Sequence, residues 1–124
     1  MQPGIALPLL VSLALTSCEF NGPCTTSVEP GLIVRVIDSA TGAPAAHEAA
    51  GVAVDGEYQE TLRNVAPEDP AAELLYGADE REGTYRVSVA KAGYQLWVRE
   101  GVRVTGDECH VRTVSLEAHL IPNP

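Results

Sequence analysis

The chain has 124 residues and a formal net charge of −9 at pH 7, with 17 acidic residues against 8 Lys and Arg. This length suits one small domain. The acidic balance argues against nucleic acid as a partner, because a phosphate backbone requires a basic surface. It also argues against electrostatic adhesion to anionic lipid head groups, so we expect the charge to serve solubility.

The N-terminal segment is apolar and ends at a cysteine. Residues 5–15 carry no charge, and small residues then lead directly to Cys18. This pattern is typical of a secretory signal and its cleavage site. With a cysteine immediately after the small residues, the segment resembles a bacterial lipobox, although residues 1–4 lack the usual positive charge. A membrane span would need about 20 apolar residues, which makes it the weaker alternative.

The lipobox resemblance implies how the protein is attached. Residues 1–17 would be a lipoprotein signal peptide, Cys18 would carry the lipid (palmitate among its chains), and residues 18–29 would form a lipidated tether. We therefore expect a cell-envelope protein held to a membrane through a lipid anchor. Glu19 follows the cysteine, in place of the aspartate associated with inner-membrane retention, which favours the outer membrane.

Two cysteines remain once Cys18 is assigned to lipid. Cys24 and Cys109 then form an even pair in an oxidising compartment, which predicts a disulfide between them. The alternative is two free buried thiols. A metal site is not expected, because it needs three or four ligands at suitable spacing and these cysteines have no such neighbours.

From residue 32 onward the sequence predicts short strands separated by turns. The expected strands are residues 32–37, 49–58, 73–76, 84–91, 94–99, 102–104 and 109–120. Apolar and polar residues alternate most clearly in 84–91 and 109–120. Gly101 is expected to interrupt the strand that starts at residue 94, before residues 102–104. Because no convincing helix occurs, the pattern predicts an all-β antiparallel sandwich or barrel.

Two segments resemble the signatures of carboxypeptidase regulatory-like domains. Residues 31–44 are similar to "V-x-D-x-x-T-G-x-P", and residues 83–94 to "G-x-Y-x-V-x-V-x-x-x-G-Y". The resemblance covers about residues 30–121, although residues 60–79 have no counterpart. It implies a transthyretin-like (prealbumin-like), seven-stranded antiparallel β-sandwich with an accessory role. We therefore expect protein–protein or structural contacts with an unidentified envelope protein.

The sequence offers no motif for catalysis. Gly-x-Ser-x-Gly and phosphate-binding glycine patterns are absent, and His47, His110 and His119 are scattered. His110 could hold a local hydrogen bond beside Cys109, and His119 is expected at the surface. The 5-hydroxyisourate hydrolases share the transthyretin-like fold, but their C-terminal Tyr-Arg-Gly-Ser is missing here. We expect neither enzymatic activity nor a cofactor.

Two further groups of residues carry weaker expectations. Asp79, Glu80 and Glu82 could attract Ca²⁺, but they lack a spaced ligand pattern and are expected to form a solvated hairpin. Tyr94 and Trp97 are candidate ligand-facing aromatics, so the alternative function is a carbohydrate-binding module. Exposure of both rings on a concave face would favour sugar binding, whereas burial would leave protein contact.

Overall fold

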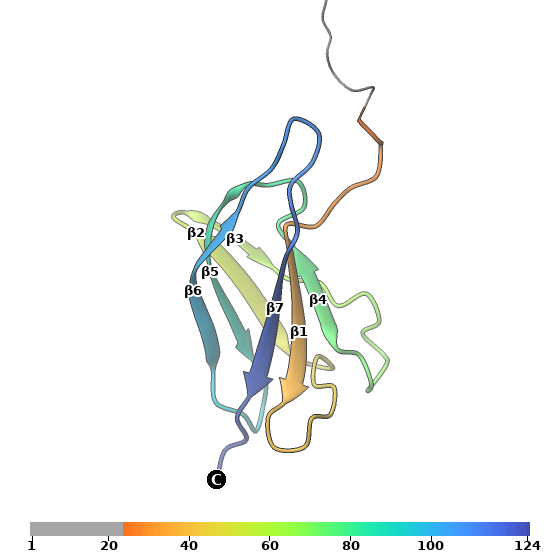
Figure 1. Cartoon of the computed structure of the whole chain (residues 1–124). Helices are drawn as coiled ribbons and strands as arrows, with labels where there is room; N and C mark the ends of the chain where they lie inside the picture. Colours follow the sequence, from red (N-terminus) through yellow and green to blue (C-terminus); the bar gives the residue numbers. More distant parts are fainter. Residues whose placement is uncertain (1–23) are drawn as a thin grey trace, which may run out of the picture.

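The computed structural model describes residues 24–124 and shows an all-β domain (Figure 1). The predicted signal peptide and the lipidation at Cys18 lie outside the described residues. Seven strands follow one another along the chain. They are β1 (Leu32–Asp38), β2 (Ala50–Asp55), β3 (Tyr58–Thr61), β4 (Leu74–Gly77), β5 (Gly83–Ala90), β6 (Trp97–Val104) and β7 (Val114–Leu120).

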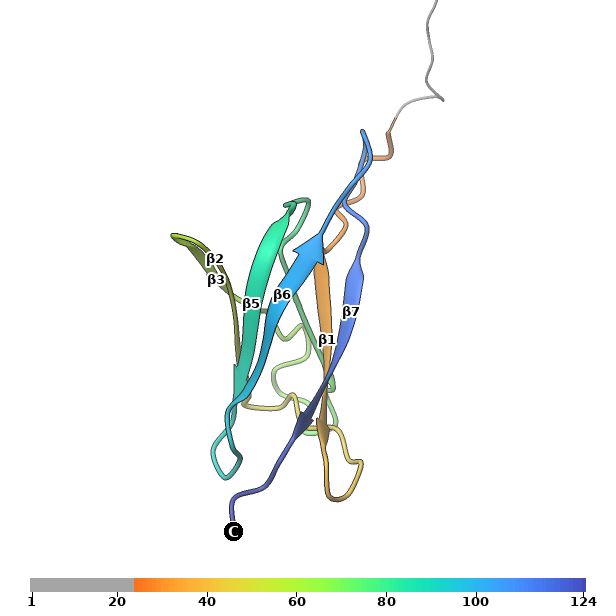
Figure 2. The ribbon, with the colours of Figure 1, turned by 60° about the vertical axis from the view of Figure 1, so that its left-hand side comes forward.

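The strands form two sheets that pack face to face as two layers (Figure 2). One sheet has the order β4-β1-β7 and the other the order β3-β2-β5-β6. This arrangement confirms the predicted all-β fold with seven strands in a sandwich-like pair of sheets. The strand pairs are antiparallel except one, because β1 and β7 run parallel. A parallel pair needs a long connection, and here most of the domain separates the two strands along the chain.

The core lies between the sheets and consists of alternate side chains of the strands. Tyr85, Val87 and Val89 of β5 are buried, as the alternation predicts. In β7, Ala118 and Leu120 are buried and His119 between them is exposed. The fully buried side chains also include several from β1, β4 and β6: Leu32, Val34, Val36, Leu75 and Val104.

The second predicted strand is two strands. Residues 49–58 were expected as a single strand with a turn beginning at Asp55-Gly56; in the structure β2 ends at Asp55 and a separate strand, β3, begins at Tyr58. Gly56 has a φ of 61°, a conformation that suits glycine and lets the chain turn back within two residues. Glycine as the first residue of a two-residue turn is a strong hairpin signal, so the chain forms β3 although most residues of this short strand are polar.

The predicted break at Gly101 is wrong. β6 continues through this residue, which has a φ of 64°. The pairing of β5 with β6 shifts between Tyr85 and Val87, so that β6 accommodates one extra residue as a bulge. Glycine in a strand can therefore mark a bulge instead of an end.

The last strand is shorter than predicted. β7 begins at Val114, whereas alternation suggested a strand from residue 109. Residues 105–113 form a loop closed by an isolated bridge between Gly106 and Val111. His110 therefore lies in a loop and does not share a strand with His119.

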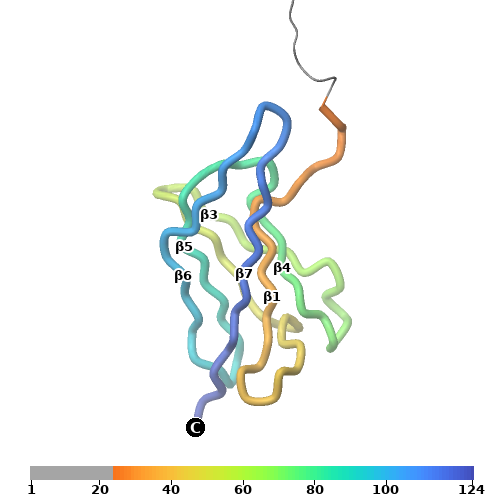
Figure 3. Tube along the Cα trace, viewed as in Figure 1, coloured from red at the N-terminus to blue at the C-terminus, as the bar shows by residue number. Residues whose placement is uncertain are grey.

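The loops gather at two opposite ends of the sandwich (Figures 1 and 3). At one end, which we call the strap end, residues 24–30 (the strap) approach loop 78–82 and loop 105–113. The other end, the distal end, contains loop 39–49, loop 91–96 and the C-terminal residues 121–124. Within residues 24–124, no helix is long and apolar enough to cross a membrane.

Candidate functional site

The predicted disulfide joins the strap to loop 105–113. Cys24 and Cys109 are bonded across 85 residues of sequence, with their Cα atoms 5.2 Å apart. In the chain-entropy model, closing a loop of this length stabilises the fold by about 4–5 kcal/mol at most. The bond also places the next residue of each segment side by side: the Thr25 hydroxyl lies 2.8 Å from Nε2 of His110.

Glu80 connects the third segment to this pair. Its carboxylate lies 2.5 Å from Nδ1 of His110 and accepts the backbone N–H groups of Glu29 and Val111, each at 3.1 Å. The Glu80 N–H in turn donates to the Glu29 carbonyl at 3.0 Å. Glu80 has a φ of 49°, which is unfavourable for a residue with a side chain. One side chain therefore ties the strap, loop 78–82 and loop 105–113 together.

The contacts of His110 determine which nitrogen carries its proton. An ionised carboxylate can only accept, so Nδ1 must donate to Glu80. In the neutral imidazole Nε2 is then an acceptor for the Thr25 hydroxyl, whose oxygen also lies 3.0 Å from Ser27 Oγ, a second acceptor for the same proton because Ser27 donates to Glu29. The hydrogen bond to Glu80 raises the pKa of His110, and the same bond lowers the pKa of Glu80. Both pKa shifts arise because the pair stabilises the charged form of each residue.

Asp107 fixes the shape of the loop that presents His110. Its carboxylate accepts the N–H groups of His110 at 2.9 Å and of Cys109 at 2.8 Å. These two backbone bonds lower the pKa of Asp107. The turn that carries the disulfide and the imidazole is therefore held by a side chain within the same loop.

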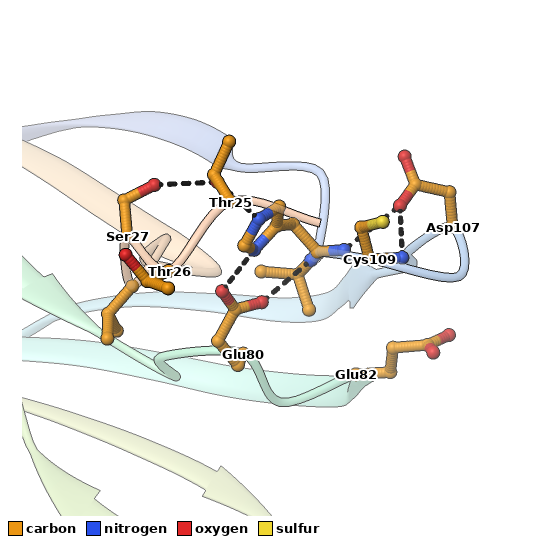
Figure 4. A pocket seen from close by; sticks show the side chains of 10 residues that line it. Thr25, Thr26, Ser27, Glu80, Glu82, Asp107 and Cys109 are labelled. Atoms are coloured by element: carbon orange, nitrogen blue, oxygen red, sulfur yellow. Dashed lines mark hydrogen bonds and ion pairs between the residues drawn. The ribbon is translucent and has the colours of Figure 1, made fainter. Parts of the chain in front are cut away.

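A cavity of about 380 Å³ lies beside these groups (Figure 4). Its lining is polar and apolar in about equal parts, and its polar residues include Thr25, Thr26, Ser27, Glu82, Asp107 and His110. The Thr25 hydroxyl is exposed, and the His110 side chain is 21% exposed. A hydroxyl, an imidazole and a carboxylate thus lie in hydrogen-bonded series at the edge of a cavity, which is the order found in nucleophilic sites.

The structure separates the acidic residues that the sequence groups together. Asp79 pairs with Arg63 at 2.9 Å and turns away from Glu80's partners, while Glu82 is exposed at the cavity. In the part of the chain that the structure describes, no group of three or more His, Cys, Asp or Glu could hold a metal ion. Of the predicted cluster, Glu80 bonds to His110 and Glu82 lines the cavity, whereas Asp79 does neither.

The histidines also separate. The imidazole of His110 was expected to hold a local hydrogen bond, but its partners, Thr25 and Glu80, come from the other two segments of the strap end. His119 pairs with Glu117 at 3.0 Å on the exposed face of β7, as expected for a surface residue. Thr25 was missed. Its position next to one cysteine, with His110 next to the other, is the sequence signal that could have found it.

Tyr94 and Trp97 lie near the distal end and do not form an exposed platform. Both rings are half-buried and pack against the core. The Tyr94 hydroxyl donates to Asp38 at 2.6 Å, which raises the pKa of Tyr94 and lowers that of Asp38. The guanidinium carbon of Arg99 lies 5.2 Å from the centre of the Trp97 ring. The exposure that would favour sugar binding is therefore not found.

No protein-family model matches the chain, and no curated protein is significantly similar to it. The function is therefore inferred from the sequence patterns and from the geometry of the strap end and the distal end.

Proposed function

We propose that the chain is a lipid-anchored cell-envelope protein whose sandwich is a carboxypeptidase regulatory-like, transthyretin-like domain that makes protein–protein or structural contacts. The observation that carries the proposal is the Cys24–Cys109 disulfide. Stable disulfides form in oxidising compartments, outside the cytoplasm of most cells. The bond thus supports the export that the N-terminal segment predicts.

The position of the disulfide supports a short attachment. Cys24 follows the predicted lipidation site, Cys18, within a few residues, and it is fixed to the sandwich. An extended segment of that length reaches about 20 Å at most. A domain anchored in this way stands close to the membrane, with its strap end toward the lipid and its distal end toward partners.

The distal end offers apolar side chains for a contact. Leu96 is 59% exposed and Ile121 is 52% exposed, and they count among the few large apolar residues that reach solvent within residues 24–124. The Gln95 N–H donates to the Ile121 carbonyl at 2.8 Å, so the two segments adjoin. Exposed apolar side chains that gather at one place mark interaction sites. We propose an envelope protein with an apolar patch as the partner.

Metabolic labelling with an alkyne fatty acid tests the anchor. The wild type is expected to incorporate the label and to sediment with membranes, and Cys18→Ser is expected to lose both properties. The matched control is the double variant Cys24→Ser/Cys109→Ser, which should keep the label because its cysteines serve the disulfide. Full labelling of Cys18→Ser would contradict the proposal.

Site-specific photo-cross-linking in intact cells tests the contact surface. A photoreactive residue at position 96 is expected to give one discrete protein adduct. The control is position 65, where Val65 is 69% exposed in the loop between β3 and β4, outside the segments that carry Leu96 and Ile121. Equal adducts from both positions, or none from position 96, would contradict a contact at the distal end.

A further inference from the structure

We propose that Thr25 is a nucleophilic hydroxyl, activated by His110 and oriented through Glu80, that accepts acyl groups from uncharged or cationic esters in the cavity at the strap end. This inference goes beyond a contact role and does not depend on it. It requires only residues of the strap, loop 78–82 and loop 105–113, and it holds whether or not the chain is lipidated.

The geometry matches what a hydroxyl nucleophile needs. The Thr25 Oγ1 atom lies 2.8 Å from His110 Nε2, and Nδ1 of the same ring lies 2.5 Å from Glu80. Both distances are short enough for proton transfer and for orientation of the base. Since Glu80 fixes the proton on Nδ1, the neutral ring presents its lone pair to the hydroxyl, which is the arrangement required for general-base catalysis.

Thr25, His110 and Glu80 are each held in place by contacts other than those they make with one another. The disulfide fixes the backbone directly before Thr25 and directly before His110. Two backbone N–H groups orient the Glu80 carboxylate, and Asp107 orients the loop around His110. Rigid supports of this kind lower the cost of assembling the reacting groups.

The cavity gives an ester access to the hydroxyl and supplies donors near it. Thr25 is exposed and lines the cavity together with the following residues of the strap. The backbone N–H groups of Thr26 and Ser27 donate to no acceptor within residues 24–124. Backbone N–H groups stabilise the negative oxygen that develops on an attacked carbonyl when they point at it.

The charges around the cavity select the ester. Glu82 and Asp107 line the same cavity as Thr25, and the carboxylate of Glu80 borders it. An ester that carries its own carboxylate would be repelled at short range. The cavity is therefore suited to uncharged or cationic esters.

The reaction balances without another reagent. The Thr25 oxygen forms a bond to the ester carbonyl carbon while its proton passes to Nε2 of His110. The bond from that carbon to the alcohol oxygen then breaks, and the proton on Nε2 passes to the departing alcohol. Water can later hydrolyse the acylated Thr25, again with His110 as the base, and this step restores the hydroxyl.

The first test is covalent labelling of the oxidised full-length chain with an uncharged fluorophosphonate, followed by peptide mass spectrometry. The adduct is expected on Thr25, and the control is Thr61, an exposed threonine in β3 with no histidine partner in the described residues. Labelling of Thr25 at the same rate as Thr61 would overturn the proposal.

The second test assigns the roles of His110 and Glu80. His110→Gln is expected to slow labelling of Thr25 at least about 100-fold, the usual contribution of a general base. The matched control, His119→Gln, breaks a histidine–glutamate pair elsewhere and should leave the rate unchanged. To exclude misfolding, each variant must keep the intact disulfide. Equal rates in all three proteins would overturn the role of His110.

The third test uses the pH profile, which a purely structural role of Glu80 would not move. Labelling should require neutral His110, so its rate is expected to rise as the pH increases through the pKa of this residue, which lies above 6.5. In Glu80→Gln the midpoint should move to lower pH, because the neutral amide no longer favours the imidazolium. An unchanged midpoint would contradict orientation through Glu80.

The fourth test addresses the selectivity of the cavity. Wild-type protein is expected to cleave 4-nitrophenyl acetate at least about 10-fold faster than the anionic 4-nitrophenyl hemisuccinate, after correction for the uncatalysed rates. Charge repulsion at the carboxylates of the cavity is the reason. Equal turnover, or preference for the anionic ester, would contradict the proposed ester class.

Discussion

The two ends of the sandwich are held together in different ways. The strap end joins three segments through a disulfide and a series of charge-assisted hydrogen bonds centred on Glu80. The distal end relies on backbone hydrogen bonds, on the bond between Tyr94 and Asp38, and on Lys91, whose ammonium donates to backbone carbonyls of loop 39–49. It has no disulfide among the described residues, and it leaves Leu96 and Ile121 exposed. The comparison shows one end cross-linked by a covalent bond and the other without one, and the exposed end is where we propose the contact.

The largest expected effect comes from removing the covalent link. The double variant Cys24→Ala/Cys109→Ala is expected to lose about 2–5 kcal/mol of unfolding free energy, because the unfolded chain regains the freedom of a long loop. Urea denaturation of the oxidised proteins measures this loss. A loss below about 0.5 kcal/mol would show that the bond does not stabilise the strap end.

A smaller loss is expected where the strap meets loop 78–82. A Cβ atom at Gly31 would lie 2.6 Å from the carbonyl oxygen of Ala78, so Gly31→Ala should cost about 1–3 kcal/mol through overpacking. Gly93→Asn at the distal end is the control. Nothing lies within 4 Å of that position, so only the strain of its φ of 89° is added, and asparagine bears positive φ better than most residues with a side chain. Equal losses by thermal unfolding would contradict the tight fit at the strap end.

The strap end should also respond to pH. The folded-state pKa of His110 is raised, so its contribution is complete below the unfolded value of 6.5 and is lost as pH rises through the folded pKa. The folded-state pKa of Glu80 is lowered, so its contribution is present above 4.5 and is lost as pH falls through the folded pKa. Stability from this pair should therefore be greatest between pH 4.5 and 6.5. The difference in unfolding free energy between wild type and His110→Gln, measured against pH, should peak there; a flat difference would contradict the pairing.

The smallest effect on stability is expected at the distal end. Leu96→Ser/Ile121→Ser should change the unfolding free energy by less than about 0.5 kcal/mol, because both side chains are largely exposed. The same variant, carrying an affinity tag, should no longer co-purify with the envelope partner that tagged wild type retains. Retained binding together with unchanged stability would contradict a contact at the distal end.

The sequence predicted best those features that depend on neighbouring residues or on residue counts. Alternation correctly identified the buried face of β5, including Tyr85, and the pairing of the two cysteines followed from their even number. Gly101 was misread because a glycine that permits a bulge looks like one that ends a strand. The parallel pairing of β1 with β7 depends on how the sheets close, which no single strand encodes.

The candidate site could not be read directly because its members are far apart in the chain. Thr25, Glu80 and His110 converge only after the sandwich has formed. The sequence also could not tell which acidic residue of the 79–82 cluster would meet His110, since Asp79 pairs with Arg63 instead. The predicted disulfide already implied that the segments containing Cys24 and Cys109 lie together. Combining it with the identity of the residue after each cysteine would have predicted the contact between Thr25 and His110.

Hydrogen exchange of oxidised and reduced protein tests the difference between the two ends most directly. Reduction is expected to release residues 24–30, so that the amide of Glu29 exchanges at the rate of an unstructured chain while Gln95, bonded to Ile121, keeps its protection. This result would show that the disulfide holds the strap in place without supporting the distal end. Equal loss of protection at both ends, or no change at Glu29, would contradict it.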